Sequence, residues 1–158
     1  FFHGRGLRRA TGPVEQSVEA LTADLLDEGW IREPLRWFDR EFAPALGIDV
    51  FEHRFDSERS YGLIETPAVR VMLIRQEGLG RVPAALGEFL DLGRAVAVPK
   101  RNEATGKGYA GSYQQFLAAV RLPVAVRDEA YESRYARHFY ADSEVVRLHE
   151  RWGGGLPE

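Results

Sequence analysis

The residues with the clearest chemical potential lie in a glycine-rich loop around Lys107. The lysine stands between Gly106 and Gly108, shortly before a segment with helical spacing that begins near Ser112. Glycine lets a backbone approach a ligand closely, free N–H groups at a helix start point outward, and the ammonium adds positive charge. The loop is therefore a candidate phosphate site. On spacing alone, a solvent-exposed loop leading into an ordinary helix cap at Ser112 is the more common arrangement.

Histidine offers a second kind of chemistry, and His138 is the best placed of the four histidines. It lies between Tyr135 and Tyr140 in an aromatic segment. A pKa near neutrality does not itself make a catalyst, so we interpret His138 as a packed or hydrogen-bonded side chain. No two histidines have the helical spacing of metal ligands, and we expect no metal site.

Two arginines, Arg134 and Arg137, lie three residues apart. Together they could bind an anionic glycan or a sulfate group. The favoured interpretation is a solvated helix face on which they pair with Asp128 or Glu132.

The elements that must position these groups are mostly helical. We expect helices at about 13–28, 34–46, 83–90, from 112, after 123, and at 143–152. In the second helix Pro44 should kink or end the element. Asp39 and Glu41 face different ways there and make a poor acid–base pair. Trp37 and the neighbouring phenylalanines are expected in the core rather than as a platform for sugar stacking. The predicted apolar side of this helix carries Leu35, Phe38, Phe42 and Leu46.

One strand is predicted from Val69 to Ile74, after Pro67. Its nearly continuous apolar run is typical of a strand covered on both faces, as in a parallel sheet. Looser alternation at 48–64 indicates short extended segments around a turn at 56–60. One such strand among several helices is too few for a complete α/β sheet.

The composition is that of a single globular domain. Of 158 residues, 44% are hydrophobic and 28% charged, which suits a packed core. A net charge of -3 gives no electrostatic case for nucleic acid. No apolar run is long enough for a membrane span. The chain has no cysteine, which excludes disulfides and fits a reducing compartment, so we expect a soluble, cytoplasmic protein.

The first residues of the chain lead to an expectation about its origin. Its only methionine is Met72, and it opens on Phe1 without a signal-peptide pattern. We therefore expect the C-terminal part of a longer α/β protein. In that view residues 1–152 form one incomplete domain and 153–158 a flexible tail.

The loop around Lys107 resembles the loop near the C-terminus of P-loop sulfotransferases that closes over the 3′-phosphate of 3′-phosphoadenosine 5′-phosphosulfate. The matching positions are Lys107, Gly108, Gly111 and Phe116, with Ser112 and Tyr113 in place of an acid and a tryptophan. The arginine that usually precedes the lysine is absent, because Gly106 stands there, and Arg101 is the nearest replacement. The resemblance implies that Lys107, Gly108 and Arg101 hold the phosphosulfate donor, without a metal.

A second likeness lies at the end of the predicted strand. The run 71–79 is similar to the sulfotransferase strand that ends in tyrosine-glutamate-aspartate-leucine. Glu77 and Leu79 match this pattern, whereas Gln76 and Gly78 depart from it. In that family the acid is mainly a structural feature, so the resemblance implies that Glu77 belongs to the architecture.

Across nearly the whole chain, the sequence resembles a bacterial branch of capsular polysaccharide synthesis proteins. The residues that carry this likeness are Trp37, Phe38, Asp39, Glu41, 47–50, Asn102, Lys107, Tyr109, Tyr131, 133–135 and 138–140. It implies a sulfotransferase-like enzyme with a three-layer, P-loop-like fold that acts on a polysaccharide or glycan acceptor. The family's catalytic segment precedes such a region, so we expect this chain to be inactive alone. The alternative is a non-catalytic module for glycan binding or assembly.

Overall fold

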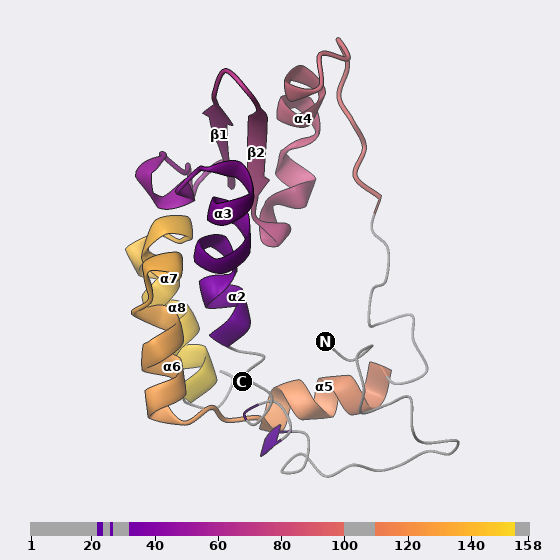
Figure 1. The fold of residues 1–158 in the computed structure, drawn as a ribbon. Helices are drawn as coiled ribbons and strands as arrows, with labels where there is room; N and C mark the ends of the chain where they lie inside the picture. Colours follow the sequence, from indigo (N-terminus) through magenta and orange to yellow (C-terminus); the bar gives the residue numbers. More distant parts are fainter. Residues whose placement is uncertain (1–21, 24–25, 27–31, 100–109, 154–158) are drawn as a thin grey trace, which may run out of the picture.

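The computed structural model describes residues 22–23, 26, 32–99 and 110–153 (Figure 1). Helices dominate, and the strands form a two-stranded sheet within this part of the chain. In chain order the elements are α2 (Arg32–Trp37), η1 (Phe38–Phe42), α3 (Ala43–Leu46), η2 (Val50–Glu52), β1 (Tyr61–Glu65), β2 (Arg70–Ile74), η3 (Gln76–Arg81), α4 (Pro83–Phe89), α5 (Ala110–Ala119), α6 (Val124–Tyr131), α7 (Arg134–Phe139) and α8 (Asp142–Gly153).

The helix predicted at 34–46 forms, but it contains a π-helical turn. It runs through α2, η1 and α3, and η1 is the π-helical part, closed by a bond from the Ala43 N–H to the Phe38 carbonyl. Pro44 has no N–H, and its ring would crowd the carbonyl four residues earlier in a regular helix. A wider turn just before Pro44 relieves that crowding. The helix ends at Gly47, whose positive φ of 68° permits the left-handed cap.

The predicted strand is present, whereas its predicted environment was wrong. β2 pairs with β1 in an antiparallel hairpin, and its apolar residues are half-buried instead of covered on both faces. The short connection between the strands allows no parallel crossover. It is a tight turn in which Thr66 Oγ1 accepts a hydrogen bond from the Val69 N–H at 3.0 Å. The predicted turn at 56–60 is confirmed, since the backbone turns at 57–60 directly before β1.

The core lies where the hairpin, the helix at 32–46, η2 and α7 meet. Its buried members are Ile48, Val50, Ile64 and Phe139. The ring of Phe139 is central, because its centroid lies 4.9 Å from those of Phe55 and Tyr135 and 5.3 Å from that of Phe38. Phe38 and Phe42 pack against this cluster as predicted. Trp37 does not, since it remains 49% exposed.

The C-terminal helices form a layer beside the helix at 32–46 (Figure 1). The helix expected after Pro123 is α6, and the helix expected at 143–152 is α8. α8 begins at Asp142, and the Glu144 carboxylate accepts a hydrogen bond from the Ala141 N–H just before it, at 3.2 Å. α7 escaped prediction as a separate helix. It begins after Ser133, whose Oγ accepts the Ala136 N–H at 3.0 Å.

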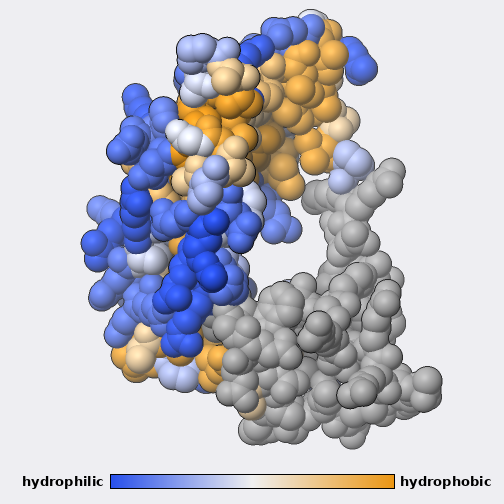
Figure 2. All heavy atoms as spheres, viewed as in Figure 1, coloured by the Kyte–Doolittle hydropathy of each residue, from blue (hydrophilic) through white to orange (hydrophobic). Residues whose placement is uncertain are grey.

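Polar and apolar side chains gather on different parts of the surface. Figure 2 shows hydrophobic residues over the hairpin and α4, and hydrophilic residues over α7 and much of α6, whose first residue Val124 is an exposed apolar side chain. Within the described ranges, no helix combines the length and the apolar character needed to cross a bilayer.

A close backbone contact fixes η3 against the turn before β1. Gly78 is buried, and a Cβ at this position would lie 2.1 Å from the Cβ of Ser60. Ser60 has no exposed surface, and its Oγ accepts a hydrogen bond of 2.6 Å from Arg81. The Arg75 N–H also bonds to the Ser60 carbonyl, at 3.0 Å. The segment that follows β2 therefore packs so closely against Ser60 that only a glycine fits at position 78.

We predict that Gly78→Ala lowers the free energy of unfolding by about 2 kcal/mol, because the new methyl group overpacks a buried contact. Gly80→Ala is the matched control in the same η3 segment, since a Cβ there meets nothing within 4 Å. It should change stability by no more than about 0.5 kcal/mol. Urea denaturation followed by circular dichroism measures both values. Equal stabilities of the two variants would contradict the packing described.

Candidate functional site

The candidate site is a cleft of about 290 Å³ between the end of β2 and α7. Its volume is at the lower end of the roughly 300–1,000 Å³ of small-molecule sites. One wall is the chain that leaves β2 into η3, and the other is formed by α7 and Tyr140. The described residues that line it are Phe38, Phe55, Leu73, Ile74, Arg75, Gln76, Glu77, Tyr135, Phe139 and Tyr140.

Arg75 lines the cleft and is held in place from several sides. It is 8% exposed, and its guanidinium makes a two-pronged ion pair with Glu144 of α8, with N–O distances of 2.8 and 3.0 Å. Nη1 also donates to the Phe139 carbonyl at 3.1 Å. The guanidinium lies over the Tyr140 ring, 4.5 Å from its centroid. The hydrogen bond from Arg75 is the main reason that the pKa of Glu144 lies below its ordinary value.

Tyr140 and Glu77 form the polar rim of the cleft. The Tyr140 hydroxyl donates to Glu77 Oε1 at 3.2 Å, which joins the end of α7 to η3. Burial, followed by the negative charge of Glu77, raises the pKa of Tyr140 above its ordinary value. The phenol therefore stays protonated and acts as a donor. The hydrogen bond to Tyr140 is compatible with the architectural role that the sequence resemblance implies for Glu77, and the side chain is also exposed at this cleft.

His138 is a packed side chain in this structure. Its ring lies edge-on to those of Phe51 and Phe139, with centroid distances of 5.2 and 4.7 Å. Burial, and then the charge of Arg134, lowers its pKa. Its Nε2 is buried and has no hydrogen-bond partner among the described residues. These contacts agree with the structural interpretation and place His138 outside the cleft lining.

Arg134 has partners other than those predicted. Its guanidinium pairs with Asp39, at 3.4 Å, and with Asp49, and it lies 4.1 Å from the Phe51 ring centroid. The predicted partner Asp128 instead contacts His149, at 2.8 Å. Two carboxylates already neutralise Arg134, so the side chain is poorly suited to an anionic ligand.

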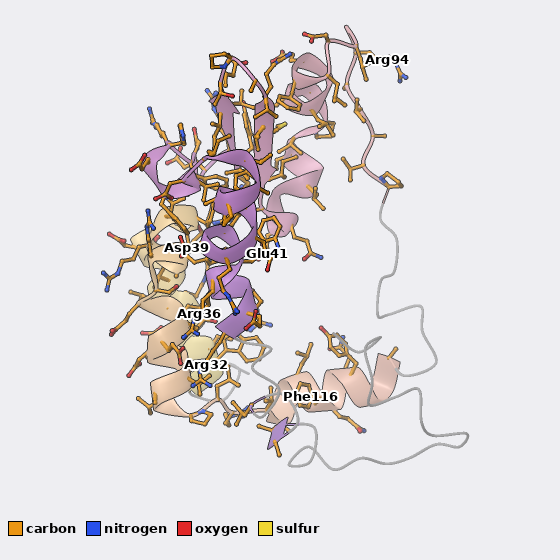
Figure 3. The ribbon with its side chains drawn as sticks, in the orientation of Figure 1. Arg32, Arg36, Asp39, Glu41, Arg94 and Phe116 are labelled. Atoms are coloured by element: carbon orange, nitrogen blue, oxygen red, sulfur yellow. The ribbon has the colours of Figure 1, made fainter. Side chains whose placement is uncertain are left out.

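The separation of the nearby acids Asp39 and Glu41 is confirmed. Figure 3 shows the two side chains on different sides of the helix, with Asp39 toward α7. Arg32 of the same helix pairs with Glu129 of α6, with the closer carboxylate oxygen 2.8 Å away. These charges connect helices and do not converge on a reacting group.

The residues predicted to hold a phosphate, Lys107, Gly108 and Arg101, lie outside the described part of the chain. The predicted helix that follows them is α5, and its Phe116 is buried. Figure 1 shows α5 apart from the end of β2. The described residues therefore do not bring the start of α5 to the cleft, and the phosphate contact stays a prediction.

The signal that identifies the cleft was present in the sequence but was divided between two segments. Glu77 follows a strand, and Tyr135 and Tyr140 occupy an aromatic segment. Their proximity depends on Arg75, whose partner Glu144 is 69 residues away in the chain. Sequence spacing alone cannot reveal such a contact. Among the residues with described positions, no group of three or more His, Cys, Asp or Glu side chains is arranged to hold a metal ion.

The fold and site define a largely helical α/β protein with a small cleft of aromatic and polar character. A family model described as "Putative capsular polysaccharide synthesis protein" matches residues 17–141. Because this match covers most of the chain, the protein belongs to that family. Comparisons with curated proteins and with solved structures gave no match.

We predict that Glu144→Gln lowers stability at neutral pH by about 2–3 kcal/mol, because it leaves the buried Arg75 guanidinium without a countercharge. The depressed pKa of Glu144 adds a pH signature. Its contribution is complete above the ordinary glutamate value of 4.5 and is lost as pH falls through the lower folded-state pKa. The variant should therefore lose less stability than the parent below about pH 4.5.

Urea titrations between pH 2 and pH 7 test this prediction, with Glu150→Gln as the matched control. Glu150 is an exposed glutamate of the same α8 helix. Its substitution should leave both the neutral-pH stability and the acid slope within about 0.5 kcal/mol of the parent. If Glu144→Gln behaves like this control, the ion pair does not contribute as described.

Proposed function

We propose that the protein is a sulfotransferase-like enzyme of capsular polysaccharide synthesis. It transfers a sulfuryl group from 3′-phosphoadenosine 5′-phosphosulfate to a hydroxyl of a capsular or related surface polysaccharide. The observation that carries the proposal is the family match over residues 17–141. The matched region includes the loop around Lys107 and the strand end at Glu77, which both resemble parts of sulfotransferases.

The proposed reaction needs positioning and charge stabilisation more than covalent help from the protein. An acceptor oxygen forms a bond to sulfur as the bond from sulfur to the phosphate oxygen of the donor breaks. The acceptor hydroxyl gives up its proton, and the products are a sulfate ester and adenosine 3′,5′-bisphosphate. By analogy with phosphoryl transfer, cationic groups would stabilise the charge on the transferred group. Lys107, Gly108 and Arg101 would hold the 3′-phosphate of the donor.

One observation favours the second candidate, a non-catalytic glycan-binding or assembly module. Among the described residues that line the cleft, Arg75 is the only cation, and Glu144 already neutralises it. The described lining of this cleft therefore offers a phosphate no cation that is free of a carboxylate partner. The two candidates differ in whether the protein binds an adenosine bisphosphate.

We predict that a saturating excess of adenosine 3′,5′-bisphosphate raises the melting temperature of the protein by about 5–10 °C. Ligand at about 100 times its Kd stabilises the folded state by about 2.7 kcal/mol, and each kcal/mol corresponds to roughly 2–4 °C in a domain of this size. Lys107→Ala should lose most of the shift, because the 3′-phosphate loses its cation. Differential scanning calorimetry measures the change.

The matched control is Lys100→Ala, which removes the same charge at the only other lysine of the chain. It should keep the shift of the parent. Adenosine 5′-monophosphate, which lacks the 3′-phosphate, should give a smaller shift. No shift of the parent with the bisphosphate would refute the donor proposal and favour the binding module.

A further inference from the structure

We propose that the cleft at the end of β2 binds a neutral sugar unit of the acceptor glycan, with the Glu77 carboxylate accepting hydrogen bonds from its hydroxyls. This inference rests on the proposed role in polysaccharide synthesis, but it is independent of the donor loop. It places the acceptor glycan at a cleft that includes Glu77, for which the sequence resemblance implies only a structural role.

The size and walls of the cleft fit a short piece of carbohydrate. A volume of about 290 Å³ accommodates about one or two sugar rings. Aromatic side chains opposite the chain that leaves β2 supply apolar surface, which the C–H face of a sugar can cover. They are the half-buried Phe38, Phe55, Tyr135 and Tyr140, whereas Phe139 borders the cleft from the buried core. An entirely apolar ligand fits less well, because a carboxylate, an amide and a phenol also line the cleft.

The polar groups at the rim of the cleft can form hydrogen bonds with the hydroxyl groups of a sugar. The Tyr140 hydroxyl donates to Glu77 Oε1 at 3.2 Å, and this is the one hydrogen bond of the Glu77 side chain found among the described residues. The other carboxylate oxygen therefore remains available as an acceptor. The adjacent Gln76 adds an exposed amide that can both donate and accept. Sugar hydroxyls need this combination of acceptors and donors.

The charges in the cleft select against an acidic sugar. Arg75 is 8% exposed and forms its two-pronged pair with Glu144, so its positive charge is already balanced. Glu77 remains as an exposed negative charge. A uronate or sulfate on the ligand would meet a like charge with no compensating cation among the described lining residues. We therefore expect a neutral unit, such as a hexose or N-acetylhexosamine, in this position.

Titration of the full chain with disaccharides tests the inference without the donor. The neutral probes are N,N′-diacetylchitobiose, lactose and mannobiose, and the acidic probe is a disaccharide of glucuronate and N-acetylglucosamine. Saturation-transfer NMR reports contact, and calorimetry reports Kd. At least one neutral probe should bind about tenfold more tightly than the acidic one. Equal binding, or no binding of any neutral probe, would overturn the inference.

The substitution Glu77→Gln separates a binding role from a structural one. Glutamine keeps an oxygen that can accept from Tyr140 but removes the charge. The variant should bind the neutral probe about tenfold more weakly and bind the acidic probe more tightly than the parent does. Glu88→Gln makes the same chemical change on the exposed face of α4 and should alter neither affinity. If both variants leave the ratio of affinities unchanged, Glu77 does not face the ligand.

The outcome is distinguishable from that of the donor proposal. A chain that gains stability from adenosine 3′,5′-bisphosphate but fails to bind the neutral probes keeps the donor proposal and rejects the acceptor cleft. A chain that binds the neutral probes without responding to the bisphosphate keeps the cleft and supports the non-catalytic module. Melting temperatures of the variants, measured without ligand, show whether each remains folded.

Discussion

The ion pair between Arg75 and Glu144 holds the described structure together. It connects the last residue before η3 with the first turn of α8, and the same guanidinium reaches the final carbonyl of α7. A charge pair with so little exposure requires good geometry to offset the loss of hydration. The two-pronged arrangement and the additional carbonyl acceptor supply that geometry. The packing of Phe139 and the position of Tyr140 both follow from where this arginine places the end of α7.

The candidate site depends on this arrangement because none of its walls is complete within one segment. The chain after β2 contributes Glu77, whereas the aromatic side chains come from α7, from the residue after it, and from Phe38 and Phe55 earlier in the chain. The buried core adjoins the cleft at Phe139, which belongs to both. In this family member, the chemistry of the cleft is therefore a property of the fold and not of a local motif.

Within the described ranges, the sequence predicted most helices, because their apolar spacing and their proline and glycine boundaries are local properties. The sequence was less informative about the direction in which strands pair and about which side chains are buried. The apolar run of β2 is compatible with a parallel or an antiparallel neighbour, and only the tight turn at Thr66 decides between them. Leu46 shows a similar limit, since it was expected on the buried side but is 42% exposed. The π-helical turn adds a residue to the helix and rotates the following positions, which regular 3.6-residue spacing cannot anticipate. The cleft could not be predicted, because its residues lie too far apart in the chain for any rule based on sequence spacing. The phosphate-binding loop around Lys107 remains a prediction from the sequence.

Asp49 gives the α7 side of the cleft a further property. Its carboxylate accepts the Phe51 N–H at the start of η2, at 3.0 Å, and also pairs with Arg134 at the start of α7. α7 is thus anchored at its first residue by Asp49 and at its last by Arg75, on opposite ends of the wall. Because α7 is fixed at both ends, binding of a ligand in the cleft does not require α7 to become ordered. Ordering of protein segments on binding costs free energy and reduces affinity. A rigid α7 in the free protein avoids this cost, which favours the binding of weak, flexible ligands.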